Sequence, residues 1–205
     1  MKKGQIFLIA SAVIVTILVI LKLNANLPEI IASKKEASEE FERELFTNIE
    51  DEFVNAVKFS SNQPDSVSDN LFRFSNFTRE KLKERMIGLD SLIVNCFVPE
   101  GSGNVNMNVS ILNFLNKGIE VNLTLNSSPI QSKQKTLSDS EKWDTNFSIT
   151  QGYTYLLTVS YNNTYHEEIL IETNGKKRYV TFFDFTFSSL HLTHKDKFQK
   201  SYTLS

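Results

Sequence analysis

Three histidines and one cysteine are the residues of this sequence best suited to metal binding or nucleophilic chemistry. His191 and His194 are three positions apart, and on a β-strand this spacing places them on opposite faces, where they do not readily share a metal ion. His166 precedes Glu167 and Glu168, so it is the remaining candidate for a third ligand. Solvent-exposed histidines account for this pattern, and we predict no metal site.

The sequence shows no arrangement that is typical of a catalytic centre. Cys96 lies in the apolar stretch 93–98, which indicates a buried side chain rather than a nucleophile. The Gly-rich segment 100–104 joins two predicted strands, whereas a phosphate-binding loop joins a strand to a helix. Ser102, within that segment, has no base nearby in the sequence. We therefore predict no catalytic residue, no cofactor and no enzymatic activity; a third alternative, an anchored hydrolase, would have to rely on the three histidines.

Composition and charge narrow the class of protein before any element is assigned. The chain has 205 residues, a formal net charge of −2 and a hydrophobic fraction of 40% that includes 16 Phe. This is enough apolar material for a core, which excludes wholesale disorder. The balanced charge gives no indication of a nucleic-acid partner, and a single Cys excludes an intrachain disulfide framework.

The N-terminal region contains an uninterrupted apolar run from Ile6 to Leu21, with lysines on both sides. Such a run predicts a transmembrane helix over residues 5–23, with the lipid bilayer as its partner. The basic residues before it favour a cytoplasmic N-terminus, so we expect a single-pass protein of the cell membrane whose remaining chain is extracytoplasmic. A cleaved secretory peptide is the alternative, but Leu23 stands where signal peptidase needs a small residue.

The same opening, MKKGQIFLIASAVIVTILVI, resembles the class III signal peptide of archaeal type IV pilins and related surface proteins over the first 22 residues. In that family a dedicated prepilin peptidase removes a short basic leader, and the apolar helix stays in the mature subunit. The resemblance implies a leader over residues 1–4, with Lys2 and Lys3 as its basic pair. It also implies that Gly4 is the last leader residue and Gln5 the new N-terminus. Prepilin peptidase and other pilin-like subunits would then be partners.

An amphipathic helix is predicted over residues 24–60. Apolar side chains recur every four residues along it, at Phe41, Leu45, Ile49, Phe53 and Val57. The other positions are strongly acidic, with three basic and eight acidic residues from 34 to 52. We interpret this segment as a stalk whose apolar stripe packs either against the protein's own head or against neighbouring subunits.

From residue 91 onward, apolar and polar residues alternate, which is typical of β-strands. Residues 61–90, before this region, are expected to form a loop and a short helix from Thr78 to Met86. Asn174–Gly175 predicts a type I′ hairpin. We expect an antiparallel β-sandwich head over residues 91–194 and a flexible tail over 195–205. Strands are predicted at 92–98, 105–111, 119–125, 143–150, 153–161, 166–173 and 178–187.

Two surface features accompany the predicted head. Six basic residues and two acidic residues lie between positions 176 and 200. Surface charges of this density are ordinary; the alternative is that the acidic stalk and this end of the head attract each other, within one subunit or between subunits. Anionic surface polymers are an alternative partner for the same basic residues. Six Asn-x-Ser/Thr sequences are candidate N-glycosylation sites, although Asn and Thr are also ordinary residues of an outward strand face: Asn76, Asn108, Asn122, Asn126, Asn146 and Asn162.

The expected fold is of the α+β class, with an N-terminal transmembrane helix and an amphipathic stalk helix followed by an antiparallel β-sandwich of the immunoglobulin-like or pilin-head type. We interpret the chain as a non-catalytic, membrane-anchored surface protein that resembles a type IV pilin subunit. The alternative is a permanently anchored β-sandwich binding module that does not assemble into a filament.

Overall fold

The structure of the chain is a computed structural model. It describes residues 3–60, 67–162, 165–190 and 192–203, and within residues 3–31 it describes the side chains of Thr16 and Lys22 alone. The chain forms two compact units, Met1–Leu45 and Phe46–Ser205.

The described part of the first unit is helical throughout and belongs to α1 (Lys3–Ser60). Helix-forming Ala, Leu, Glu and Lys are frequent in this part of the sequence. On its surface, Lys35 and Glu39 are four residues apart and form an ion pair of 3.8 Å. A lone helix has no second layer of structure on which to bury apolar side chains.

The structure corrects the predicted transmembrane helix. In the part of the chain that the structure describes, no helix combines the length and the apolar character needed to cross a membrane. The apolar run from Ile6 to Leu21 has sixteen residues. At 1.5 Å per residue it is about 24 Å long, less than the roughly 30 Å of the hydrocarbon layer. The predictions of a membrane-spanning segment over 5–23, and of a single-pass location in the cell membrane, are therefore wrong.

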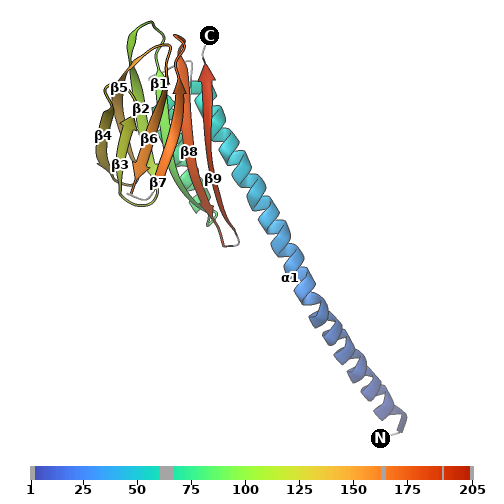
Figure 1. Ribbon diagram of the computed structural model, residues 1–205. Helices are drawn as coiled ribbons and strands as arrows, with labels where there is room; N and C mark the ends of the chain where they lie inside the picture. The colour runs from blue at the N-terminus through green and yellow to red at the C-terminus, as the bar shows by residue number, and fades with distance from the viewer. Residues whose placement is uncertain (1–2, 61–66, 163–164, 191, 204–205) are drawn as a thin grey trace. The chain divides into compact units, whose positions relative to one another are not determined.

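The second unit is built around two antiparallel sheets, shown in Figure 1. One sheet has five strands in the order β5-β2-β1-β8-β9, and the other has four in the order β4-β3-β6-β7. Together with helix α2 (Val67–Lys83), the strands in the described residues are β1 (Gly88–Val98), β2 (Asn104–Phe114), β3 (Ile119–Leu125), β4 (Gln131–Leu137), β5 (Glu141–Thr150), β6 (Thr154–Tyr161), β7 (Tyr165–Glu172), β8 (Arg178–Ser188) and β9 (Thr193–Thr203).

The main core lies between the two sheets. Alternate side chains of each strand point inward, so that Val94 and Cys96 on β1 meet Val121 and Leu123 on β3 in one fully buried cluster. The four-stranded sheet shows the alternation clearly, because β3 is buried at every second residue. The prediction of an antiparallel β-sandwich is confirmed.

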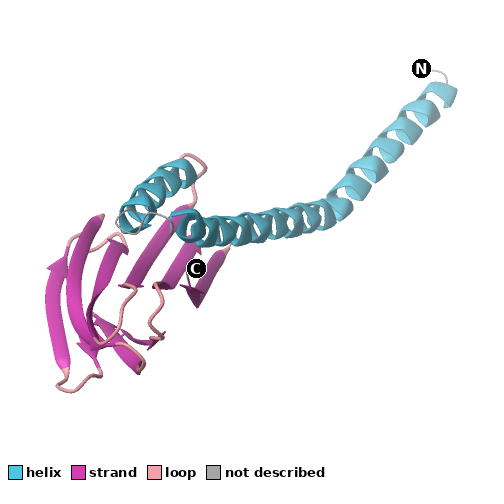
Figure 2. Cartoon of the chain, turned by 90° about the horizontal axis from the view of Figure 1, so that it is seen from above, coloured by secondary structure: helices cyan, strands magenta, loops and turns pink. Residues whose placement is uncertain are grey.

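A second apolar layer covers the other face of the five-stranded sheet. Figure 2 shows α2 and the end of α1 lying on this face. Phe53 of α1 packs against Phe185 of β8 with ring centroids 4.9 Å apart, and Phe72 of α2 lies 5.3 Å from Phe114 of β2. Because both faces of β1 and β8 are covered, these strands are apolar on both sides. Within the second unit, the stripe residue Phe53 thus packs on the protein's own head.

Several boundaries differ from those expected. Residues 193–203 form strand β9, paired along its length with β8, and are not a flexible tail. A strand not predicted, β4, lies at the edge of the four-stranded sheet. Helix α2 begins at Val67, within the predicted loop. Asn174–Gly175 connects strands of different sheets, and only Gly175 has the positive φ (78°) that both central residues of a type I′ turn require, so the predicted hairpin is wrong.

Candidate functional site

Four ionisable side chains join the two sheets at one place, and we call them the Asp184 cluster: Tyr161, Glu167, Asp184 and Lys197. Asp184 on β8 accepts a hydrogen bond of 2.5 Å from the Tyr161 hydroxyl on β6. The same carboxylate lies 3.3 Å from Nζ of Lys197, the residue opposite it on β9. Lys197 Nζ also lies 2.5 Å from Glu167 on β7. Two strands of each sheet therefore supply one side chain each.

Partial burial determines the electrostatics of the Asp184 cluster. Burial raises the pKa of the Tyr161 hydroxyl, and the Asp184 carboxylate raises it further, so Tyr161 stays a proton donor. Burial by itself lowers the pKa of Lys197. Its hydrogen bond to Glu167 and its attraction to Asp184 outweigh that effect, and the pKa of Lys197 is raised overall. Lys197 contacts both carboxylates, and the neutral Tyr161 donates a hydrogen bond to one of them, which is typical of a structural network rather than a reactive centre.

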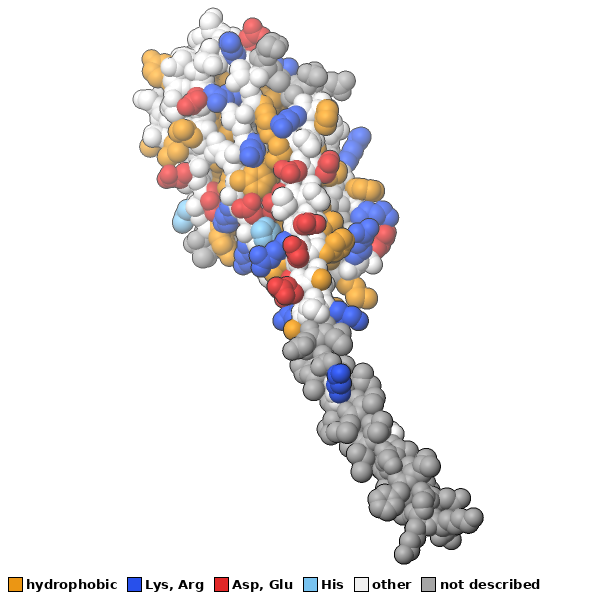
Figure 3. All heavy atoms as spheres, turned by 90° about the vertical axis from the view of Figure 1, so that its right-hand side faces the viewer, with side chains coloured by type: hydrophobic (Ala, Val, Ile, Leu, Met, Phe, Trp, Pro, Cys, Tyr) orange, Lys and Arg blue, Asp and Glu red, His pale blue; other side chains and the backbone are white. Residues whose placement is uncertain are grey.

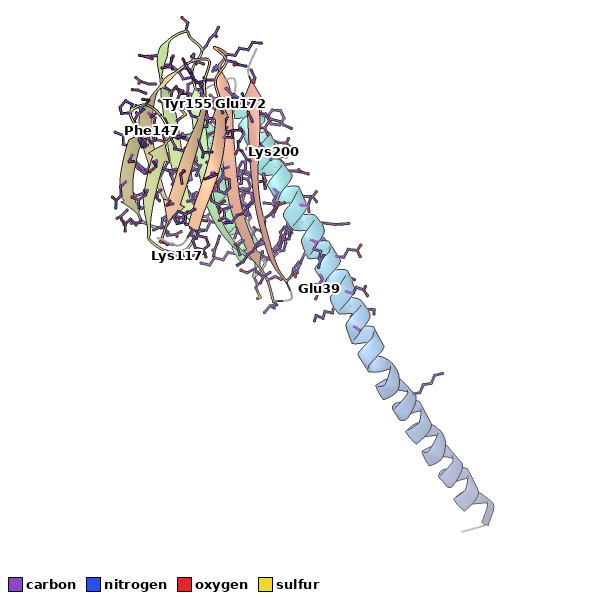
Figure 4. The ribbon with its side chains drawn as sticks, in the orientation of Figure 1. Glu39, Lys117, Phe147, Tyr155, Glu172 and Lys200 are labelled. Atoms are coloured by element: carbon purple, nitrogen blue, oxygen red, sulfur yellow. The ribbon has the colours of Figure 1, made fainter. Side chains whose placement is uncertain are left out.

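A hollow of about 230 Å³ lies beside this cluster. Two further lysines line it, Lys117 at the turn between β2 and β3 and Lys195 on β9. Figure 4 marks Lys117 at the end of the sandwich where β2 turns into β3. Both lysines are exposed, and neither is within ion-pair distance of a carboxylate in the described residues. Their charges are therefore available to an incoming anionic group.

A larger hollow of about 590 Å³ surrounds Arg79 of α2. The guanidinium lies 3.3 Å from both oxygens of Asp139 and donates a hydrogen bond of 2.9 Å to Ser140 Oγ. It also donates to Asn116 Oδ1 and lies 5.5 Å from the centre of the Phe114 ring. Because Asp139 neutralises the guanidinium, we interpret Arg79 as a joint between α2 and two loops of the sandwich.

Glu50 of α1 and His194 of β9 form a third ionisable contact, with Oε1 and Nε2 3.3 Å apart. The His194 ring lies beside the stacked pair of Phe46 and Phe187, with ring centroids 6.0 and 6.2 Å away. Burial raises the pKa of Glu50, and the nearby Asp196 raises it further, whereas His194 lowers it. This contact fixes the first turns of α1 in the second unit to the edge strand.

The structure pairs one of the three histidines, His166, with a serine that the sequence did not single out. Ser160 Oγ and His166 Nδ1 are 2.7 Å apart on neighbouring strands β6 and β7. The pair is exposed, and no carboxylate that would orient the imidazole is hydrogen-bonded to it in the described residues. No group of three or more potential metal ligands occurs in those residues either. Cys96 is fully buried, and burial raises the pKa of its thiol to about 12.

The six candidate glycosylation sites occupy different environments. Asn108 and Asn146 are exposed and directly opposite each other on β2 and β5. Asn126 is exposed after β3, whereas Asn122 on β3 is half-buried. Asn76 lies on α2, where its amide donates to the Phe72 carbonyl, and Asn162 adopts a positive φ of 54° after β6. None of these features distinguishes a modified asparagine from an ordinary polar one.

The leader residues predicted from the resemblance lie mostly beyond what the structure can describe. Gly4 and Gln5 belong to the helical backbone of α1, as does Lys3, but their side chains are outside the described set. Lys2 and His191 lie outside the described residues altogether. The structure therefore brings none of them into a site.

Comparisons with known proteins give no family for this chain. No protein-family model matches it, and no curated protein matches it. Among solved structures, it is similar to an ASH/PapD-like domain of human CEP192 (PapD-like domain 7), with 14% identity and a TM-score of 0.20 over 55% of this chain and 82% of that chain. A protein from Archaeoglobus fulgidus shows 9% identity and a TM-score of 0.20 over 56% of this chain and 98% of that chain. Likenesses this weak imply nothing about function.

Proposed function

We propose that this chain is a non-catalytic structural subunit, similar to a type IV pilin subunit, which assembles through its N-terminal helix. One observation carries the proposal: the described part of the unit Met1–Leu45 is a single helix. Its sequence contains an uncharged apolar run over residues 6–21. A helix that is apolar on all sides requires burial, and most helix stability in proteins comes from packing on neighbours. Helices of further copies would provide those neighbours.

The second unit suits the role of a head because it completes its own core. It contains two packed sheets and a helical layer over one of them. Phe46, Phe53 and Val57 attach the end of α1 to this head and are fully buried there. The head therefore does not need the first unit's apolar residues for its own packing, which leaves them available for assembly.

Processing before assembly is part of this proposal. A prepilin peptidase would cut between Gly4 and Gln5, where the small glycine lets the backbone enter the enzyme's site. Mass spectrometry of the protein isolated from its native cells would then find Gln5 as the first residue. The variant Gly4→Leu should remain uncut and Gly4→Ala, which keeps a small residue, should be cut. Retention of Met1 in the native protein would contradict the processing step.

Assembly itself is tested with the Ile14→Lys variant, which places a charge in the apolar run, and with Ile14→Val as the matched control. We expect the parent chain and Ile14→Val to form large species in sedimentation velocity and filaments in electron micrographs. Ile14→Lys should remain monomeric, because a buried unpaired charge costs several kcal/mol. Assembly of Ile14→Lys to the same extent as the parent would contradict the proposal.

The alternative function is a binding module that does not assemble. The observation in its favour is the hollow beside the Asp184 cluster, where Lys117 and Lys195 have no carboxylate partner in the described residues. The two functions are distinguished by the parent chain: a protein that remains monomeric at all concentrations after native processing would favour the binding module.

A further inference from the structure

We propose that one contact of the assembled state pairs carboxylates on the helix of one copy with lysines on the head of a second copy. The carboxylates are Glu36, Glu40 and Glu44, which we call the acidic stripe. The lysines are Lys117 and Lys195, which we call the lysine pair. This inference rests on the proposed function and names the partner of one surface within it.

The acidic stripe consists of carboxylates of the first unit that have no described ion-pair partner. Of the acidic residues in this stretch, Glu39 pairs with Lys35 and Glu50 with His194. The three residues of the stripe are exposed and have no described ion-pair partner. Their spacing of four residues places them along one side of the helix, about 6 Å apart. They form a row of exposed carboxylates on the helix of the first unit.

The lysine pair is selected by the same reasoning applied to the head. Most other basic groups of its C-terminal region already contact a carboxylate or an aromatic ring; the rings are those of Phe97, under Lys177, and Phe198, under Lys200. Lys197 contacts Glu167 and Asp184, and Arg178 contacts Glu172 at 3.1 Å. Lys117 and Lys195, by contrast, approach the hollow from two different elements and line a concave surface together with Tyr165 and Thr186. Figure 3, which faces the β9 side of the head, shows basic side chains grouped beside acidic ones. A carboxylate entering this hollow would meet the two ammonium groups. The carboxylates that also line the hollow, Asp90 and Asp184, already accept hydrogen bonds from the side chains of Asn116 and Tyr161.

The symmetry of such a contact fits the proposed subunit. The stripe and the lysine pair are different surfaces, so each copy uses one surface to receive a neighbour and the other to reach the next. A contact between unlike surfaces does not close into a dimer and generates rings or open filaments. Exposed ion pairs contribute little energy individually, so this contact would set the register between subunits while the apolar helices provide most of the affinity.

The test uses full-length protein with reversed charges. One variant carries Glu36→Lys, Glu40→Lys and Glu44→Lys, and the other carries Lys117→Glu and Lys195→Glu. We expect each variant alone to associate about tenfold more weakly than the parent in low salt, measured by sedimentation velocity. An equimolar mixture of the two should recover association, because the reversed stripe then faces the reversed lysine pair. Raising the salt concentration should weaken the association of the parent and remove the difference in association between the parent and the variants.

Matched controls keep the outcome specific. Glu100→Lys and Lys133→Glu reverse exposed charges elsewhere on the head and should leave association unchanged. Unchanged urea midpoints show that the variants fold. Parent-like association of both reversed variants, or weakening that the mixture does not recover, would overturn this inference while leaving the proposed function in place. Reversals that alter the urea midpoint but not association would place the contact within one copy, and would also overturn it. A parent that never associates would overturn the proposed function itself.

Discussion

The side-chain amide of Gln131 binds the main chain of Ser148 in both directions. Gln131 Nε2 donates to the Ser148 carbonyl at 2.6 Å, and the Ser148 N–H donates to Gln131 Oε1 at 3.0 Å. The two residues belong to β4 and β5, which are edge strands of different sheets. The amide thus takes the place of a neighbouring strand. Two residues further along β5, the Tyr155 hydroxyl accepts a hydrogen bond from the Thr150 N–H and donates one to the Thr150 carbonyl. Edge strands closed in this way do not recruit other chains by strand pairing.

Replacing Gln131 with Ala should lower the free energy of unfolding by about 1–2 kcal/mol, because its two hydrogen bonds with Ser148 and its hydrogen bond to Ser127 Oγ are lost. Gln131→Glu should cost more, because a carboxylate oxygen would then face the Ser148 carbonyl. Gln134→Ala, on the exposed side of the same strand, is the control: it removes one solvent-exposed hydrogen bond, to Glu120, and should change stability by less than about 0.5 kcal/mol. Urea unfolding followed by circular dichroism measures all three, and equal losses in Gln131→Ala and Gln134→Ala would contradict the role of the amide.

Glu50 predicts a pH dependence whose sign follows from its raised pKa. A carboxyl with a higher pKa in the folded state binds more protons when folded, so its contribution favours folding at low pH. This contribution is lost as the pH rises from about 4.5, the ordinary value, through the raised folded pKa. Asp51, Asp196 and His194 are the titratable groups that act on it.

The Glu50→Gln variant should remove this loss of stability, because the amide has no charge to bury. We expect the variant to gain stability relative to the parent as the pH rises through that window, measured by urea unfolding at successive pH values. Glu52→Gln, at an exposed position of the same helix that is not among the groups acting on Glu50, serves as the control. A constant difference between the Glu50→Gln variant and the parent across the window would exclude Glu50 as the group responsible.

Sequence patterns predicted best the strands that alternate strictly between apolar and polar residues or that are apolar on both faces. Residues 105–111 alternate strictly and lie within β2, and residues 178–187 are apolar on both faces and form β8, covered on both sides. In β4, by contrast, Leu137 is the one fully buried residue, because an edge strand buries little, so QSKQKTL shows no apolar period. β9 is similarly polar and is held by its pairing with β8. The buried residues of α2 do recur at helical spacing, but two of them are polar and the segment is rich in Ser and Asn, which are typical of loops. These buried residues are Val67, Leu71, Ser75, Thr78 and Leu82.

The ionisable groups of the head were harder to predict, because tertiary structure alone brings them together. Glu167 and Lys197 are 30 residues apart and meet only because the two sheets pack at this edge. The signal that was available is Asp184, a single charge inside the otherwise apolar and hydroxyl-bearing β8, since a charge in a buried strand requires a partner. The partner's identity depends on sheet order, which local patterns do not determine.

Arg79 should be more important for stability than its position near the surface suggests. Arg79→Ala removes its contacts with Asp139, Ser140 and Asn116, and we expect a loss of about 1–3 kcal/mol in the free energy of unfolding. Arg79→Lys should recover little, because an ammonium cannot reproduce the guanidinium fork. Arg73→Ala is the matched control on the exposed side of α2. A loss from Arg73→Ala as large as that from Arg79→Ala would contradict the joint between α2 and the loops.

Cys96 provides a direct probe of opening, because the chain has one Cys and burial raises the pKa of its thiol to about 12. At pH 8 the native thiol is protonated and inaccessible, so a thiol reagent should label it at least about 10³-fold more slowly than in denaturant. The rate should increase with urea in parallel with unfolding. Rapid labelling of the native protein at pH 8 would show that the core between the sheets opens locally.

Tyr161 is the remaining test of the Asp184 cluster. Tyr161→Phe keeps the ring and its stacking with Tyr165, at 4.8 Å between centroids, but removes the hydroxyl that donates to Asp184. In this variant Lys197 is the one described side-chain partner that Asp184 retains. We expect a loss of about 1–2 kcal/mol in the free energy of unfolding near neutral pH. Because the pKa of Tyr161 is raised, its phenol should also ionise above the ordinary pH of a tyrosine in a spectroscopic alkaline titration of the folded protein. Tyr165→Phe keeps the Asp184 bond and is the control. If Tyr161→Phe leaves both stability and the alkaline titration unchanged, the hydroxyl does not hold the two sheets together, and the cluster reduces to the ion pairs of Lys197.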